Sequence, residues 1–97
     1  MFNKQRYLTR GINENIPIEL QCYLWNLIDT MTVDEKDYLQ VFDIKNTNTG
    51  LEITHSQECP EYSKIHRIHN YFNDTVDIKI FVIDSGDYST MLFAHEY

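Results

Sequence analysis

Side chains that could bind a metal ion lie close together in the second half of the sequence: His55, Cys59, His66 and His69. Thiolate and imidazole groups are ligands that zinc accepts in a tetrahedral site. The spacing of these residues, however, matches no common zinc finger, and in a strand the side chains of His66 and His69 would point to opposite faces. We therefore predict no metal site and no cofactor, and we interpret these residues as polar side chains on a sheet face and its loops.

Carboxylates and a histidine that could perform acid–base chemistry lie near the end of the chain: Asp84, Asp87, His95 and Glu96. Such groups act as general acid and base when burial separates their pKa values. The two aspartates, however, flank a Ser-Gly turn, where aspartate commonly bonds to the backbone of its own turn. The sequence contains no glycine-rich phosphate loop, and no nucleophile lies at a recognised spacing from a histidine. We predict that the protein is not an enzyme; the alternative is a small hydrolase or transferase that uses the loop from Asp84 to Asp87.

A long amphipathic helix is predicted over residues 16–31, with Pro17 in its first turn and Asn15 as the best N-cap. Its main apolar stripe consists of Ile16, Leu20, Tyr23, Leu24, Leu27, Ile28 and Met31. A second stripe lies on the far side of the same helix and consists of Ile18, Cys22, Trp25 and Asp29. A helix over one sheet needs only one apolar face, so the second stripe predicts a partner-binding surface. The alternative is that the chain covers this stripe itself, for instance with residues 60–72.

The remaining segments read mainly as strands, because β-branched and aromatic residues recur between turn-forming residues. Pro60–Phe72 fits either a strand or a helix, and its composition favours a strand. Asn73, Asp74 and Thr75 are expected to turn the chain into the next strand. The predicted strands are Arg6–Gly11, Tyr38–Ile44, Leu51–Ser56, Ser63–Phe72, residues 76–84 and Tyr88–Ala94. The sequence therefore predicts an α+β fold in which one N-terminal helix packs on a mostly antiparallel sheet of about five or six strands, in the order β-α-β-β-β-β-β.

The composition predicts one domain over residues 1–97 that does not bind nucleic acid directly. A chain of 97 residues is too short to form two cores. Its 15 acidic and 8 basic residues give a net charge of −7, which repels a phosphate backbone. Lys4, Arg6 and Arg10 form a basic N-terminal segment that we interpret as a solvated edge strand.

Charged residues interrupt the first twenty positions, so we expect no signal peptide, and we find no apolar run long enough for a membrane span. A cytosolic location is therefore expected, in which Cys22 and Cys59 remain free thiols.

Three blocks of the sequence resemble one family: RYLTRGINENIPIELQCYLWNLID near the start, HSQECPEY in the middle and KIFVIDSGDYSTMLFAHEY at the end. The family consists of proteins of about this length from low-GC Gram-positive bacteria and their mobile elements, and it is known only as a domain of unknown function first described from staphylococci. The resemblance implies a cytosolic, single-domain bacterial protein and transfers no catalytic residue.

The function predicted from the sequence is a small acidic cytosolic module that binds or regulates another protein. A homodimer is its simplest form, because one self-complementary patch closes under two-fold symmetry. A basic surface on a nucleic-acid-processing protein would be a suitable partner for the acidic body.

Overall fold

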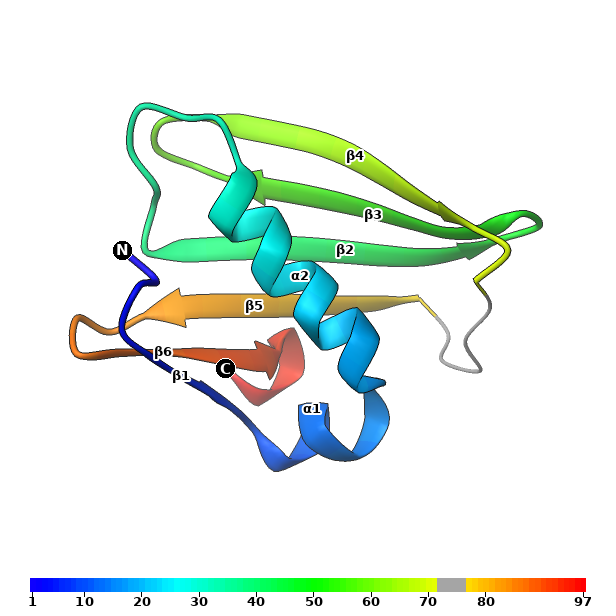
Figure 1. The fold of residues 1–97 in the computed structure, drawn as a ribbon, viewed down its shortest axis with the longest axis horizontal. Helices are drawn as coiled ribbons and strands as arrows, with labels where there is room; N and C mark the ends of the chain where they lie inside the picture. Colours follow the sequence, from blue (N-terminus) through cyan, green and yellow to red (C-terminus); the bar gives the residue numbers. More distant parts are fainter. Residues whose placement is uncertain (72–76) are drawn as a thin grey trace.

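The computed structural model describes residues 1–71 and 77–97, which form a six-stranded sheet with one long helix against it (Figure 1). The elements in chain order are β1 (Gln5–Leu8), α1 (Arg10–Asn15), α2 (Ile18–Thr30), β2 (Leu39–Thr47), β3 (Gly50–Gln57), β4 (Tyr62–His69), β5 (Ile78–Asp84), β6 (Tyr88–Phe93) and the 3-10 turn η1 (Ala94–Glu96). The predicted α+β fold is confirmed.

The strands lie in the order β1-β6-β5-β2-β3-β4. Pairing is antiparallel throughout, except that β1 runs parallel to β6. This exception arises because α1 and α2 separate β1 from β2, which lets the first strand pair with the last one. The sheet is therefore mixed but mostly antiparallel.

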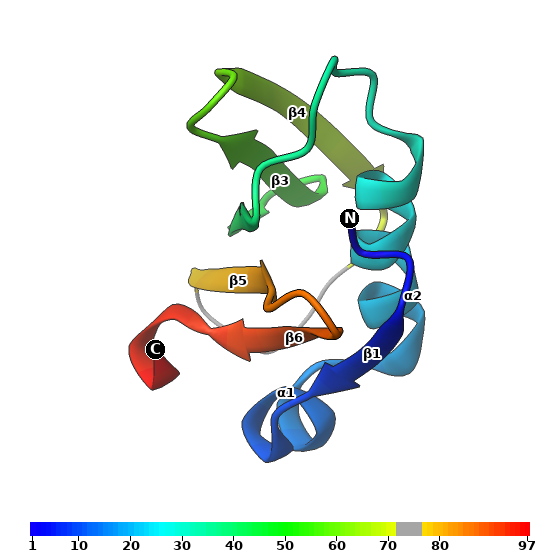
Figure 2. The ribbon, with the colours of Figure 1, turned by 90° about the vertical axis from the view of Figure 1, so that its left-hand side faces the viewer.

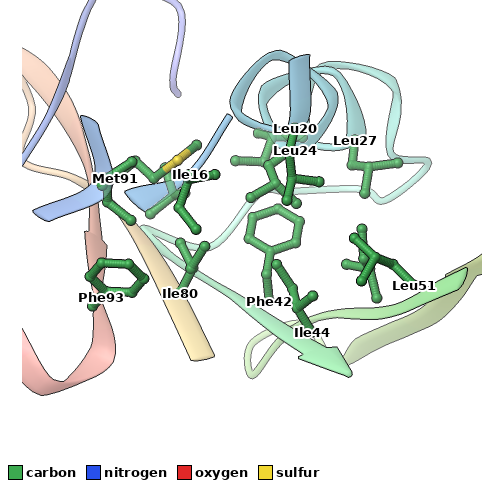
Figure 3. Close-up of a cluster of buried hydrophobic side chains, with 14 of the residues drawn as sticks. Ile16, Leu20, Leu24, Leu27, Phe42, Ile44, Leu51, Ile80, Met91 and Phe93 are labelled. Atoms are coloured by element: carbon green, nitrogen blue, oxygen red, sulfur yellow. The ribbon is translucent and has the colours of Figure 1, made fainter. Parts of the chain in front are cut away.

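Helix α2 packs its main apolar stripe against one face of the sheet (Figures 2 and 3). The helix side of the core contains Ile16, Leu20, Leu24, Leu27 and Ile28, which are all buried. The sheet side contains Phe42, Ile44, Leu51, Ile53, Ile80, Val82, Met91 and Phe93. Tyr23 is partly buried against the same cluster. The predicted main stripe thus forms the helical half of the core, except for Met31, which is the C-cap residue and is only partly buried.

The N-terminal elements differ from the prediction. The first strand ends at Leu8 rather than Gly11, and residues 10–15 form α1 instead of a polar link. Thr9 caps this short helix by accepting a hydrogen bond from the N–H of Ile12, whose side chain is fully buried. A helix of six residues with one buried anchor is too short to show a helical period.

The predicted cap of the long helix is also wrong. Asn15 lies at the end of α1, where its side chain donates to the carbonyl of Gly11 at 2.9 Å. Pro17 occupies the N-cap position of α2 and makes no side-chain capping bond. The α2 helix therefore begins at Ile18 and ends at Thr30.

Residues 62–69 form a strand, which confirms the favoured interpretation of this segment. It pairs along its whole length with β3, from Gly50↔His69 to Gln57↔Tyr62. Phe72 and the predicted turn at residues 73–75 lie outside the described residues. Within the described residues, no helix is long and apolar enough to cross a membrane.

Candidate functional site

The structure divides the second stripe of α2 into an exposed half and an engaged half. Ile18 is 67% exposed and Cys22 is also exposed, one turn apart at the start of the helix. Trp25 is half-buried and packs against the edge of the core. Asp29 is exposed but is held in an ion pair. The four residues lie on one side of the helix, as their spacing predicts.

Arg6 of β1 engages the second half of this stripe. Its guanidinium carbon lies 4.7 Å from the centre of the Trp25 ring, which is a cation–π contact. Its Nη1 and Nη2 atoms donate to the two carboxylate oxygens of Asp29 at 3.2 and 2.5 Å. Its Nε and Nη2 atoms also donate to the carbonyl of Phe2 at 3.1 and 2.8 Å. One arginine therefore joins the N-terminal segment to the helix.

The alternative prediction was that residues 60–72 of the chain cover this stripe. Of this segment the structure describes residues 60–71, in which Tyr71 reaches α2. The contact that Tyr71 makes on α2 is to Glu19, whose Oε1 lies 3.5 Å from the tyrosine hydroxyl. The cover over Trp25 comes from β1. The sequence shows that Arg6 is charged, but no local pattern in it predicts a contact between Arg6 and Asp29, which lies 23 residues away.

The N-terminal segment is fixed by Phe2 and Asp84. The Phe2 side chain is buried, and the residue adopts a positive φ of 62°. Its N–H donates to Oδ2 of Asp84 at 2.6 Å, while the N–H of Gly86 donates to Oδ1 at 2.7 Å. Burial opposes ionisation of Asp84, but these hydrogen bonds and the nearby N-terminal ammonium bring its pKa below the ordinary value. Asp84 thus acts as a structural link between the N-terminus and the β5–β6 loop.

The predicted acid–base set is split between the two ends of the β5–β6 hairpin. Asp84 and Asp87 flank the loop, whereas His95 and Glu96 follow the far end of β6. His95 and Glu96 line a cavity of about 490 Å³ together with residues of α1 and the start of β5. Oε1 of Glu96 accepts hydrogen bonds from the Thr9 hydroxyl and the Phe93 N–H, both at 2.8 Å. The structure does not bring these four residues into one site.

The set with metal-binding chemistry is also dispersed. His55 is buried on β3, Cys59 is exposed in the loop before β4, and His66 and His69 lie three positions apart on β4. In the part of the chain that the structure describes, no three potential ligands are placed to hold a metal ion.

His55 instead forms part of a buried polar network that the sequence did not reveal. Its ring stacks on Phe42 at 4.5 Å, and its Nε2 lies 2.7 Å from Oε1 of Gln40. Because that oxygen is an acceptor, Nε2 donates, and His55 is the neutral Nε2–H tautomer. Burial, followed by the charges of His66 and Lys36, lowers the pKa of His55 from 6.5 to about 4.

Two glutamines extend this network to the two loops at the end of the β2–β3 hairpin opposite its turn. The Nε2 atom of Gln40 donates to Oε1 of Gln57 at 2.7 Å and to the carbonyl of Asp37 at 2.9 Å. The Nε2 atom of Gln57 donates to the carbonyls of Glu35 at 3.0 Å and Pro60 at 2.8 Å. The network therefore fixes the segment after α2 and the turn before β4. The alternation of β3 predicts that His55 points inward. No local pattern in the sequence predicts the hydrogen bonds of Gln40 and Gln57.

The comparisons with known proteins agree with this fold. The chain superposes with a TM-score of 0.87 on the crystal structure of a protein of unknown function from Enterococcus faecalis, at 25% sequence identity over 98% of this chain and 92% of that one. No curated protein matches the sequence. Residues 5–96 match a family whose description is "Staphylococcal protein of unknown function (DUF960)".

Proposed function

Because the chain belongs to that family, whose description assigns no activity, we propose from its structure that it is a small protein-binding or regulatory module of the cytosol. The observation that supports the proposal is the exposure of Ile18 and Cys22 on the outer side of α2, next to Trp25. Large apolar side chains exposed beside an aromatic ring are typical of contact surfaces between proteins.

The engaged half of the stripe prepares this surface for binding. Trp25 is held by Arg6 on one side and by the core on the other. A ring that is already ordered loses little conformational freedom when a partner packs against it. We therefore assign Ile18 and Cys22 as the contact residues, with Trp25 as their rigid border and Asp29 as the group that fixes Arg6.

The charge of the chain favours a partner with a basic surface. The protein carries a net charge of −7, and Glu19 is exposed next to Ile18. Two copies that met through α2 would bring like charges together, whereas a basic partner would be attracted at long range. A basic surface on a nucleic-acid-processing protein suits this chemistry.

The test compares wild-type protein with Ile18→Ser in a binding assay against cytosolic extract and then against each purified partner. Ile65→Ser is the matched control, because Ile65 is also exposed but lies on β4. We expect Ile18→Ser to lose the partner, Ile65→Ser to retain it, and the wild-type affinity to fall as salt concentration rises. Equal capture by both variants, or binding that is indifferent to salt, would contradict the proposal.

A further inference from the structure

The face of the sheet opposite α2 carries a second apolar surface. Strand alternation turns Phe42, Ile80 and Met91 toward the helix, so their neighbours point to the other side. We call this side the open face; its apolar residues are Tyr7, Leu39, Val41, Ile65, Phe81, Ile83, Tyr88 and Leu92. Among the described residues, the C-terminal end of the chain also reaches this side (Figure 2): the ring of Tyr97, which is itself 74% exposed, meets the ring of Phe81 at 5.8 Å.

The open face is continuous across four neighbouring strands. Val41 lies opposite Phe81, and Phe81 lies opposite Leu92, so one apolar row crosses β2, β5 and β6. Tyr7 of β1 and Tyr88 of β6 extend it to the sheet edge, where their rings meet edge to face at 5.6 Å. These two rings are 52% and 45% exposed. Exposed tyrosines around an apolar centre are the composition of a protein interface.

The charges on this face differ from those on the rest of the molecule. The charged strand residues that point this way are Asp43, Lys45, Glu52, Arg67 and Lys79. Lys79 pairs with Asp43 at 3.7 Å, and Arg67 pairs with Glu52 at 3.5 Å. Three cations and two carboxylates make the face nearly neutral in a protein whose net charge is −7. Two copies can therefore approach through it without the repulsion that opposes contact elsewhere.

The size of the open face also suits a second copy. Six strands at a spacing of about 4.8 Å, each with about seven residues of about 3.3 Å, give a face of roughly 24 by 23 Å. If both faces are treated as flat, two of them in contact bury about 1,100 Å² in total, and uneven side chains add to this area. The value is just below the lower limit of about 1,200 Å² for specific interfaces. The two exposed residues on α2 provide much less area.

We propose that two copies of this chain pack through their open faces, so that the two sheets form the centre of the dimer and the two α2 helices its outer layers. Sheets that pack face to face lie about 10 Å apart and interleave their apolar side chains. Both copies of the Ile18–Cys22 surface remain outside. The proposed dimer therefore uses a different surface from the proposed partner-binding site. An experiment can disprove the dimer without disproving partner binding, and the reverse.

The test measures the mass of the protein in solution by light scattering and sedimentation equilibrium. We expect wild-type protein to have twice the monomer mass of 11.6 kDa. Thr90→Arg places a long cation in the middle of the open face, and Tyr88→Arg places one where the native ring is already largely exposed. Each should weaken self-association by at least about 30-fold, the effect of losing one central contact residue.

Ile18→Arg is the matched control, because it adds the same charge on α2. It should remain a dimer. Circular dichroism and thermal melting establish that each variant is folded, and Tyr88→Arg decides the question if Thr90→Arg does not fold. A monomeric wild type at all soluble concentrations would overturn the proposal. A dimer that Ile18→Arg abolishes and Tyr88→Arg retains would overturn it as well.

Discussion

Arg6→Ala removes the side chain that joins the N-terminal segment to α2. Arg6 donates to the Phe2 carbonyl, pairs with both oxygens of Asp29 and lies over the ring of Trp25. Its loss leaves the Phe2 carbonyl and the Asp29 carboxylate to water and uncovers one face of the indole. The expected result is a less stable protein with a more solvated tryptophan.

The expected loss of stability is about 2 kcal/mol. The ion pair with Asp29 is partly exposed and contributes about 0.2 to 1 kcal/mol. The cation–π contact adds about 0.5 to 1 kcal/mol. The charged hydrogen bonds to the partly buried Phe2 carbonyl add about 1 kcal/mol. For a chain of this length, a loss of about 2 kcal/mol lowers the melting temperature by roughly 8 to 16 °C.

The assay follows urea and thermal unfolding together with tryptophan emission, which reports on one position because Trp25 is the sole tryptophan. Arg10→Ala is the matched control: the Arg10 side chain is 89% exposed and pairs only along the surface of α1 with Glu14. That variant should lose no more than about 0.5 kcal/mol and keep the wild-type emission. Arg6→Lys retains the charge but not the planar fork, so it should fall between wild type and Arg6→Ala.

The role assigned to Arg6 is refuted if Arg6→Ala has the same melting temperature as Arg10→Ala and leaves the emission of Trp25 unchanged. A destabilised Arg6→Ala protein with unchanged emission would show that the bonds to Phe2 matter and that the indole is covered by other groups.

Two further predictions concern His55 and Gly11. Since the pKa of His55 is lowered to about 4 in the folded protein, its contribution to stability is complete above the ordinary value of 6.5 and declines as pH falls through 6.5 toward 4. Urea unfolding of wild type should therefore show about 2 kcal/mol less stability at pH 5 than at pH 7.5 from this residue, and His55→Gln should flatten that decline; an equal decline in both proteins would contradict it. Gly11→Ala should lose about 1 kcal/mol despite the helical preference for alanine, because the new Cβ would lie 2.9 Å from Oε2 of Glu96 and 3.3 Å from Phe93. Thermal unfolding of Gly11→Ala with and without Glu96→Ala tests this: the cost should shrink when the carboxylate is absent, and a cost that stays the same would place the strain elsewhere.

Local patterns in the sequence predicted the elements whose buried residues repeat. The main stripe of α2 and the alternation of residues 51–55 both follow from one buried face, so periodicity was sufficient to place them. The strand at residues 62–69 followed from its β-branched and aromatic composition.

Contacts between distant segments could not be predicted in this way. The bond between Phe2 and Asp84, the contact of Arg6 with α2 and the parallel pairing of β1 with β6 join residues that are far apart in the chain. The second stripe of α2 illustrates the limit: spacing placed Trp25 and Asp29 on the outer side, but only the position of β1 explains why they are engaged while Ile18 and Cys22 are not.

The parallel pairing of β1 with β6 has a mechanical consequence. The chain enters β1 at one end of this strand pair and leaves β6 at the opposite end. A force that pulls the two termini apart therefore acts along the strands and loads the hydrogen bonds between them together rather than one after another. Extension by the termini should meet its main resistance at this strand pair, and the protein should yield only when β1 slides along β6.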